Sequence, residues 1–121
     1  MSPELRALVV GEDPTTCRAV ADELAELCLV VEASSYDAAL IVLDRDGDID
    51  AVVCDHGAAT ELDGLALLAE VQRRFPEARR VLLVGEQVDQ RVEAAIASGL
   101  AWWVIAKPWR SGEVLTAVAG G

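Results

Sequence analysis

Charged side chains stand at the ends of three short apolar segments of the sequence. Glu12 and Asp13 come at the end of the first segment. Asp55 comes directly after residues 51–54, and Lys107 comes directly after the last apolar segment. If these segments are strands of one parallel sheet, their carboxyl ends share the edge at which such sheets bind ligands. Two or three carboxylates suit a hard divalent cation such as Mg²⁺, and an ammonium group balances an incoming phosphoryl group. The spacing therefore predicts a site for phosphoryl chemistry at this edge.

Asp55 is the candidate nucleophile of that site. A carboxylate at the mouth of a strand can attack phosphorus and form an acyl phosphate while a metal ion and Lys107 neutralise the transferring oxygens. The alternative is that Asp55 only caps the turn that follows its strand. The charged residues at all three segment ends favour the nucleophile over the cap.

The elements that must position these residues alternate along the chain. Apolar runs typical of buried strands alternate with segments whose apolar residues recur every three or four positions, as in helices. We expect strands at 5–11, 29–32, 51–54, 81–84 and 102–106. This alternation predicts an α/β fold, a single-domain (βα)5 doubly wound parallel sheet over residues 1–121.

Five amphipathic helices are expected between and after these strands. The first starts at Pro14 and presents a stripe that extends to Leu27 and Cys28. The second follows Ser34 and Ser35, the third covers 64–75, the fourth ends before Gly99, and the fifth starts at Ser111. Their expected inward residues are Ala39, Leu40 and Leu43; Leu65, Leu68, Val71 and Phe75; Val88, Val92, Ala95 and Ile96; and Val114, Leu115 and Val118.

Composition narrows the classes of function. The chain has 121 residues, 21 acidic against 10 basic, and a net charge of -11. Nucleic acids and anionic membranes are bound by lysine and arginine, so we expect no direct contact with either. Three cysteines without a C-x-x-C spacing predict buried thiols in a reducing compartment. Without a leader sequence or a long apolar run, the chain is expected to be cytoplasmic.

The strand-end residues lie in motifs that resemble those of response-regulator receiver domains of two-component systems. Residues 9–14 (VVGEDP) are similar to the acidic-pair motif of that family, 52–55 (VVCD) to its phosphoacceptor strand, and 106–109 (AKPW) to its Lys-Pro segment. Residues 75–85 and 99–109 most resemble receivers of the hydrogenase-regulator and HD-GYP phosphodiesterase type. The resemblance covers essentially the whole chain.

The resemblance implies a flavodoxin-like switch domain rather than an enzyme. It implies that Asp55 accepts a phosphoryl group from a sensor histidine kinase or phosphotransfer protein, and that signalling proceeds by protein contacts. By position, Glu12, Asp55 and the Gly57 carbonyl would hold Mg²⁺, and Lys107 would contact the phosphoryl group. We expect the domain either to act alone or, given its short last helix, to belong to a longer regulator.

Three positions depart from the family pattern. Gly11 replaces the first acid of the pair, which leaves Asp13 as the candidate to compensate, and Val84 replaces a small hydroxyl residue. Val104 replaces the aromatic residue expected three positions before the lysine. The loop at 56–64 also lacks a proline and has one residue more than expected. Gly11, Val84 and Val104 favour an alternative, a pseudo-receiver that acts as a binding or dimerisation module without phosphate, whereas Asp55 and Lys107 favour a working site.

Other chemistry-bearing residues have simpler interpretations. His56, which follows Asp55, is expected to be a loop histidine rather than a metal ligand. Trp102, Trp103 and Trp109 are expected to pack, although adjacent strand residues face opposite sides, so one of the first two is a candidate for a homodimer or partner surface. An aspartyl phosphatase would need a second acid where Gly57 stands.

Overall fold

Strands and helices alternate along the chain as the sequence predicts. The computed structural model describes residues 5–45, 48–56, 64–85 and 90–119. Within them the order is β1 (Leu5–Val10), α1 (Pro14–Leu24), β2 (Cys28–Ala33), α2 (Tyr36–Arg45), β3 (Ala51–His56), α3 (Gly64–Arg74), β4 (Arg79–Val84), α4 (Gln90–Ser98), β5 (Trp103–Ala106) and α5 (Glu113–Ala119). Each predicted strand and helix has its counterpart.

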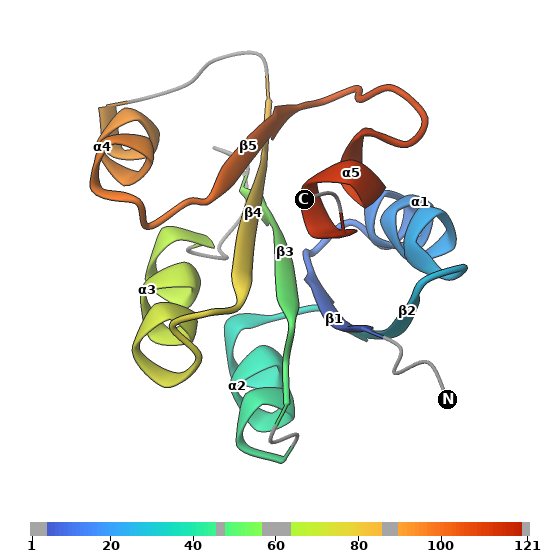
Figure 1. Cartoon of the computed structure of the whole chain (residues 1–121), viewed down its shortest axis with the longest axis horizontal. Coiled ribbons are helices and arrows are strands. Elements are labelled where there is room, and N and C mark those ends of the chain that lie inside the picture. The colour runs from blue at the N-terminus through green and yellow to red at the C-terminus, as the bar shows by residue number, and fades with distance from the viewer. Residues whose placement is uncertain (1–4, 46–47, 57–63, 86–89, 120–121) are drawn as a thin grey trace.

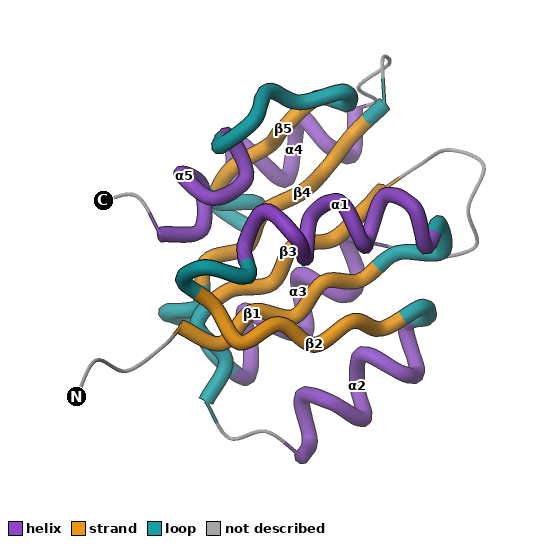
Figure 2. The backbone as a smooth tube through the Cα atoms, turned by 90° about the vertical axis from the view of Figure 1, so that its right-hand side faces the viewer, coloured by secondary structure: helices purple, strands orange, loops and turns teal. Residues whose placement is uncertain are grey.

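The strands form one parallel sheet in the order β2-β1-β3-β4-β5. Helices α1 and α5 cover one face, and α2, α3 and α4 cover the other (Figures 1 and 2). The chain winds outward from β1 to β2 and then crosses to β3, so the strand order reverses between β1 and β3. The doubly wound (βα)5 fold is therefore confirmed, with its switch point at the carboxyl ends of β1 and β3.

Two apolar clusters, one on each face, hold the sheet and helices together. Central strands are buried on both faces, so their sequences read as continuous apolar runs rather than as alternation. Val52 and Cys54 of β3 face the cluster under α2, α3 and α4, whereas Val53 faces the cluster under α1 and α5. Burial of both faces fixes the register, because a slip of one residue would exchange the two sets.

The first helix is shorter than predicted. Helix α1 ends at Leu24, the amide of Leu27 bonds the Leu24 carbonyl in a turn, and Cys28 begins β2. The chain has to reverse there to enter an edge strand, so Leu27 is exposed and the predicted stripe stops one turn early.

Some predicted inward residues face outward or lie at the margin. Ile96 of α4 is exposed, and Leu40, Phe75 and Leu115 are only partly buried. Helices α2, α3 and α5 instead bury Val42, Leu67 and Ala117. Val88 lies outside the described residues. The direction of each buried face depends on how the helix sits on the twisted sheet, which periodicity alone does not give.

The cysteines and the helix lengths test two further expectations from the sequence. Cys17, Cys28 and Cys54 are buried free thiols, as predicted. None of the helices in the described ranges has the length and apolar character needed to cross a membrane.

Candidate functional site

An ion pair joins Asp55 to Lys107 at the carboxyl edge of the sheet. Asp55 lies near the end of β3 and is only 5% exposed, and Lys107 follows β5. Lys107 Nζ donates to Asp55 Oδ1 at 2.5 Å. Strand β4 lies between these strands, and the Lys107 amide bonds the Val84 carbonyl at its end. The structure thus brings together the two residues predicted to carry phosphoryl chemistry.

Glu12 and Asp13 follow β1, the neighbour of β3 at the same edge. Glu12 is exposed. Asp13 has a different task, because its carboxylate caps α1 by accepting from the Thr15 amide at 3.0 Å and from Thr16 Oγ1 at 2.9 Å. These hydrogen bonds, that of the Thr16 hydroxyl above all, lower the pKa of Asp13. Asp13 is therefore engaged in capping and does not replace the acid absent at Gly11.

The space around Gly11 is already filled. A Cβ atom added to Gly11 would lie 2.9 Å from Cys17 Sγ and 3.0 Å from Asp55 Cβ, both too close for ordinary contact. The Cys17 thiol donates to the Gly11 carbonyl at 3.5 Å. Burial, reinforced by the negative charge of Asp55, raises the pKa of Cys17 to about 11, so the group stays a neutral thiol. The missing acid is therefore accompanied by close packing against the candidate nucleophile.

Val84 and Val104, the other two departures from the family pattern, lie on β4 and β5 as the sequence predicts. Val84 ends β4, is buried and pairs with Ala106 of β5. Val104 is partly buried against the cluster beneath α2, α3 and α4. Neither side chain can donate or accept a hydrogen bond, so neither can couple a phosphoryl group to the neighbouring elements in the usual way.

His56 ends β3 and does not lie in the following loop, which corrects its predicted placement. Its strand pairing continues to Val84, so the backbone remains extended for one residue beyond Asp55. The Nδ1 atom is buried and has no hydrogen-bond partner in the structure as described. Gly64 packs nearby, since a Cβ atom there would lie 3.3 Å from His56 Cβ. Gly57 and the rest of the loop through residue 63 lie outside the described residues.

The donor set determines whether a divalent cation fits this edge. Mg²⁺ is held in many proteins by one or two carboxylates, waters and phosphate oxygens. Asp55 near the end of β3 and Glu12 after the end of β1 supply two carboxylates from adjacent parts of this edge, and Gly57 is not described. In the described part of the chain, no three His, Cys, Asp or Glu side chains form a group suited to a metal. A cation at this edge would therefore depend on Asp55, Glu12 and water, a smaller donor set than an intact acidic pair would give.

The three tryptophans differ in their surroundings. Trp102 is 59% exposed and Trp103 is 39% exposed, which corrects the expectation that they pack. Trp109 is partly buried under α1 and α5, and its Nε1 donates to Glu23 Oε1 at 3.2 Å. Nothing in the sequence singles out Glu23. Its contact could not have been found from spacing, because 86 positions separate the two residues.

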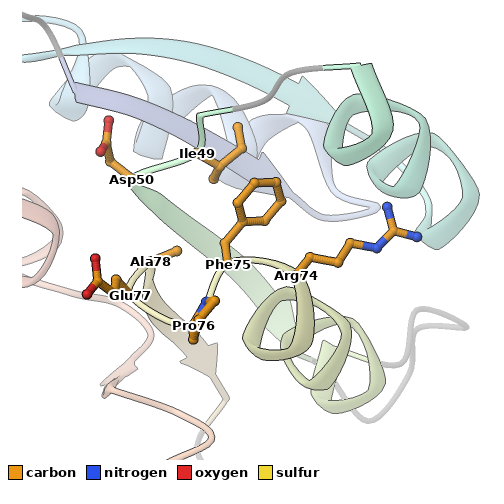
Figure 3. A pocket seen from close by; sticks show the side chains of 7 residues that line it. All are labelled: Ile49, Asp50, Arg74, Phe75, Pro76, Glu77 and Ala78. Atoms are coloured by element: carbon orange, nitrogen blue, oxygen red, sulfur yellow. The ribbon is translucent and has the colours of Figure 1, made fainter.

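Cavities lie at both the carboxyl and the amino edge of the sheet. One of 260 Å³ opens at the carboxyl edge and is lined by Gly11, Glu12, Pro14, Cys17, Glu32, Ala33 and Ser34. A larger one of 480 Å³ lies at the opposite, amino edge, with Phe75 beside Ile49, the carboxylates of Asp50 and Glu77 to one side, and Arg74 to the other (Figure 3). Arg74 forms an ion pair with Asp44 of α2. The larger cavity is thus remote from Asp55.

Comparison with known proteins places the fold. No family model matches the chain, and no curated protein matches it. The signal receiver domain of an HD domain-containing protein from Pseudomonas fluorescens Pf-5 is similar, with 25% identity and a TM-score of 0.81 over 97% of this chain and 85% of that chain. NtrX from Brucella abortus, in complex with ADP, is similar at 28% identity and a TM-score of 0.81 over 93% of this chain and 26% of that one.

A third similar structure contains a modified aspartate. It is a response regulator protein from Burkholderia pseudomallei with a phosphorylated aspartic acid, a calcium ion and citrate, 21% identical with a TM-score of 0.81 over 95% of this chain and 66% of that chain. The neighbour from Pseudomonas fluorescens Pf-5 is a signal receiver domain and that from Burkholderia pseudomallei a response regulator, both of them signalling proteins. The strand order and these neighbours together show that the chain has the fold of response-regulator receiver domains, as its sequence resemblance predicts.

Proposed function

We propose that residues 1–121 form an atypical receiver domain that accepts a phosphoryl group on Asp55 from a sensor histidine kinase or a phosphotransfer protein. The observation that carries the proposal is the contact of 2.5 Å between Lys107 Nζ and the buried carboxylate of Asp55 at the carboxyl edge of the sheet. A carboxylate and an ammonium group held at that edge are the two protein groups that this transfer needs.

In the transfer, a carboxylate oxygen of Asp55 attacks the phosphorus atom of a phosphohistidine. A P–O bond forms, the P–N bond breaks, and the imidazole leaves with the bonding electron pair and takes a proton from solvent. Lys107 is placed to balance the negative charge on the phosphoryl oxygens. The side chain of Val84, which is buried at the end of β4, has no hydroxyl group to donate to the phosphoryl oxygens. We therefore expect transfer to be slower than at a site that has such a donor.

A divalent cation, proposed to be Mg²⁺, completes the site. Asp55 and Glu12 are the carboxylates that would hold it, with the Gly57 carbonyl as a third ligand. When bound, such a cation neutralises charge on phosphoryl oxygens. The Burkholderia pseudomallei response regulator, whose structure contains a phosphorylated aspartic acid and a calcium ion, supports a divalent cation at this kind of site. With two carboxylates, we expect this affinity to be weak.

The output is proposed to be protein contact in the cytoplasm. The acidic chain has few cations with which to bind nucleic acid or an anionic membrane directly. The signal is proposed to pass either through formation of a homodimer or to another protein that binds this domain.

Intact mass tests the proposal. The protein is incubated with a small acyl phosphate, with and without Mg²⁺, as the native chain, as Asp55→Asn and as Asp50→Asn. Asp50 is a matched control because it lies at the opposite edge, where its carboxylate accepts from the Arg6 amide, which an asparagine can also do. We expect one phosphoryl group on the native chain and on Asp50→Asn, dependent on Mg²⁺, and none on Asp55→Asn. No gain on a folded native chain would reject the proposal.

A second candidate is the pseudo-receiver, a binding or dimerisation module without phosphate. The exposed Trp102 and Trp103 at the β5 edge favour it, as does the closed space at Gly11. It predicts self-association or partner binding that does not change with a phosphodonor and weakens in Trp103→Ala. Light scattering of both proteins tests this, and a monomer whose mass is unaffected by Trp103→Ala would count against dimerisation.

A further inference from the structure

Glu23 of α1 holds two separate parts of the segment that follows β5. Its Oε1 accepts from Trp109 Nε1 at 3.2 Å, and its Oε2 accepts from the Leu115 amide at 2.9 Å. One carboxylate therefore fixes both the indole two residues after Lys107 and the first turn of α5. Helices α1 and α5 pack side by side over the same face of the sheet (Figure 1).

The position suits a carboxylate. The first amides of a helix have no partner within the helix and carry partial positive charge, so an acceptor with negative charge stabilises them. The Leu115 amide is one of these groups, and Glu23 reaches it from another helix. The partly buried Trp109 indole also needs an acceptor, because its N–H is a donor only.

The same segment begins at the candidate phosphoryl site. The Lys107 amide bonds the Val84 carbonyl and its Nζ bonds Asp55 Oδ1. A phosphoryl group on Asp55 would bond to a carboxylate oxygen and remove the carboxylate charge that Lys107 pairs with, so the ammonium group would have to move toward the phosphoryl oxygens. A shift of Lys107 passes along only two residues before it reaches the Trp109 contact with Glu23.

The opposite side of β5 offers fewer means of transmitting such a shift. Val84 and Val104 have no polar atom in their side chains. Arg80, at the amino edge of the sheet, holds the turn before β5. Its buried side chain donates to the Gly99 and Leu100 carbonyls, and its own carbonyl accepts from the Trp102 amide. Among the residues that the structure describes, the contacts therefore connect Lys107 to α1 and α5 more directly than to α4.

We propose that Glu23 is a positioning residue that couples the Asp55–Lys107 pair to the seam between α1 and α5. Its phosphorylation-dependent part rests on the proposed function. The coupling itself requires only that the Asp55–Lys107 contact change.

The fluorescence of Trp109 tests this coupling. The background protein is the full chain carrying both Trp102→Phe and Trp103→Phe, so that Trp109 is its only indole. The emission is recorded before and after treatment with a small acyl phosphate and Mg²⁺, with intact mass as the measure of phosphorylation. The same spectra are taken with Asp55→Asn, which removes the charge on Asp55 without phosphate. Each condition is repeated with Glu23→Gln and with Glu26→Gln, an exposed residue beyond the end of α1 that serves as the matched control.

We expect the Trp109 emission to shift on phosphorylation and in Asp55→Asn, with most of that shift lost in Glu23→Gln and retained in Glu26→Gln. Phosphoryl gain by mass without a Trp109 shift would overturn the inference and leave the proposed function intact. No phosphoryl gain would reject the proposed function, and Asp55→Asn then decides the coupling alone. An equal shift with and without Glu23 would overturn it in either case.

Discussion

Two cations at opposite edges of the sheet are held in different ways. Lys107, at the carboxyl edge, bonds one carboxylate, and its side chain is 27% exposed. Arg80, near the start of β4 at the amino edge, is 4% exposed and donates to the carbonyls of Leu100, Pro76, Ala78 and Gly99 at 2.8 to 3.2 Å. Among the described residues, no carboxylate is recorded as a partner of Arg80.

The contacts of Arg80 are fixed, whereas the contact of Lys107 with Asp55 can change. Burial lowers the pKa of Arg80, which shows the cost of placing that charge away from water. Four carbonyls of the backbone offset this cost, and none of them can be modified without breaking the chain. Lys107 instead depends on a single carboxylate that can itself react. The amino edge is thus suited to hold the fold, and the carboxyl edge is suited to respond.

Replacing Arg80 should have the largest effect on stability. Arg80→Met would leave four buried or partly buried carbonyls without their donor, and we expect unfolding to become easier by about 4 kcal/mol. Urea denaturation measures this, with Arg73→Met as a control because Arg73 is an exposed partner of Glu70. A loss of less than about 1 kcal/mol in Arg80→Met would break the comparison between the edges.

The two halves of the Asp55–Lys107 pair should respond unequally. Lys107→Met leaves a buried carboxylate without its counter-ion, at an expected cost of about 2 to 3 kcal/mol. Asp55→Asn removes the charge from the more buried partner and leaves an ammonium group that water can reach, so its cost should be smaller. Urea denaturation of both variants and of the double variant measures the difference. Equal losses would contradict the view that Asp55 carries the buried charge.

Gly11 and Cys17 should behave as a coupled pair beside Asp55. In Gly11→Ala the new Cβ would press on Cys17 Sγ and Asp55 Cβ, and we expect a loss of about 1 to 2 kcal/mol together with slower phosphorylation. Adding Cys17→Ala removes one of the two contacts and should recover part of the loss. A double-mutant cycle by urea denaturation measures the coupling, and strictly additive effects would show that the two residues do not compete for this space.

Val84→Thr should change stability and chemistry in opposite directions. A hydroxyl at this buried position should cost about 1 kcal/mol. The same hydroxyl would lie beside the Asp55–Lys107 pair, where a donor to phosphoryl oxygens should raise the rate of phosphorylation about tenfold or more. Val81→Thr, on the same strand away from the carboxyl edge, is the control and should lose stability without a gain in rate. A similar rate in both variants would separate Val84 from the site.

The sequence predicted the carboxyl edge better than the amino edge. Strand ends in a parallel sheet meet at one edge, so Asp55 and Lys107 could be placed together from the order of elements alone. The reversal of strand order followed from the same pattern. The extra pairing of His56 with Val84 could not be predicted, because the end of a strand depends on the backbone of its neighbour.

The contacts of Arg80 and Glu23 lay beyond sequence reasoning for a common reason. Charged residues are mostly exposed, so Arg80 within β4 and Glu23 on α1 gave no sign of burial or of a partner. Arg80 bonds carbonyls, which every residue carries, and therefore has no complementary side chain to search for. Glu23 meets an amide and an indole far along the chain. Such pairs become visible only when the helices are placed on the sheet.

Trp102 should show the smallest effect and the sharpest contrast between backbone and side chain. Its amide bonds the Arg80 carbonyl at 2.7 Å, so the backbone belongs to the fixed amino edge, although the residue as a whole is 59% exposed. We expect Trp102→Ala to change stability by less than about 0.5 kcal/mol by urea denaturation. In single-tryptophan variants, acrylamide should quench Trp102 more strongly than Trp109, whose indole is bonded to Glu23. Protection of Trp102 at high protein concentration, lost on dilution, would show instead that a second copy covers this surface.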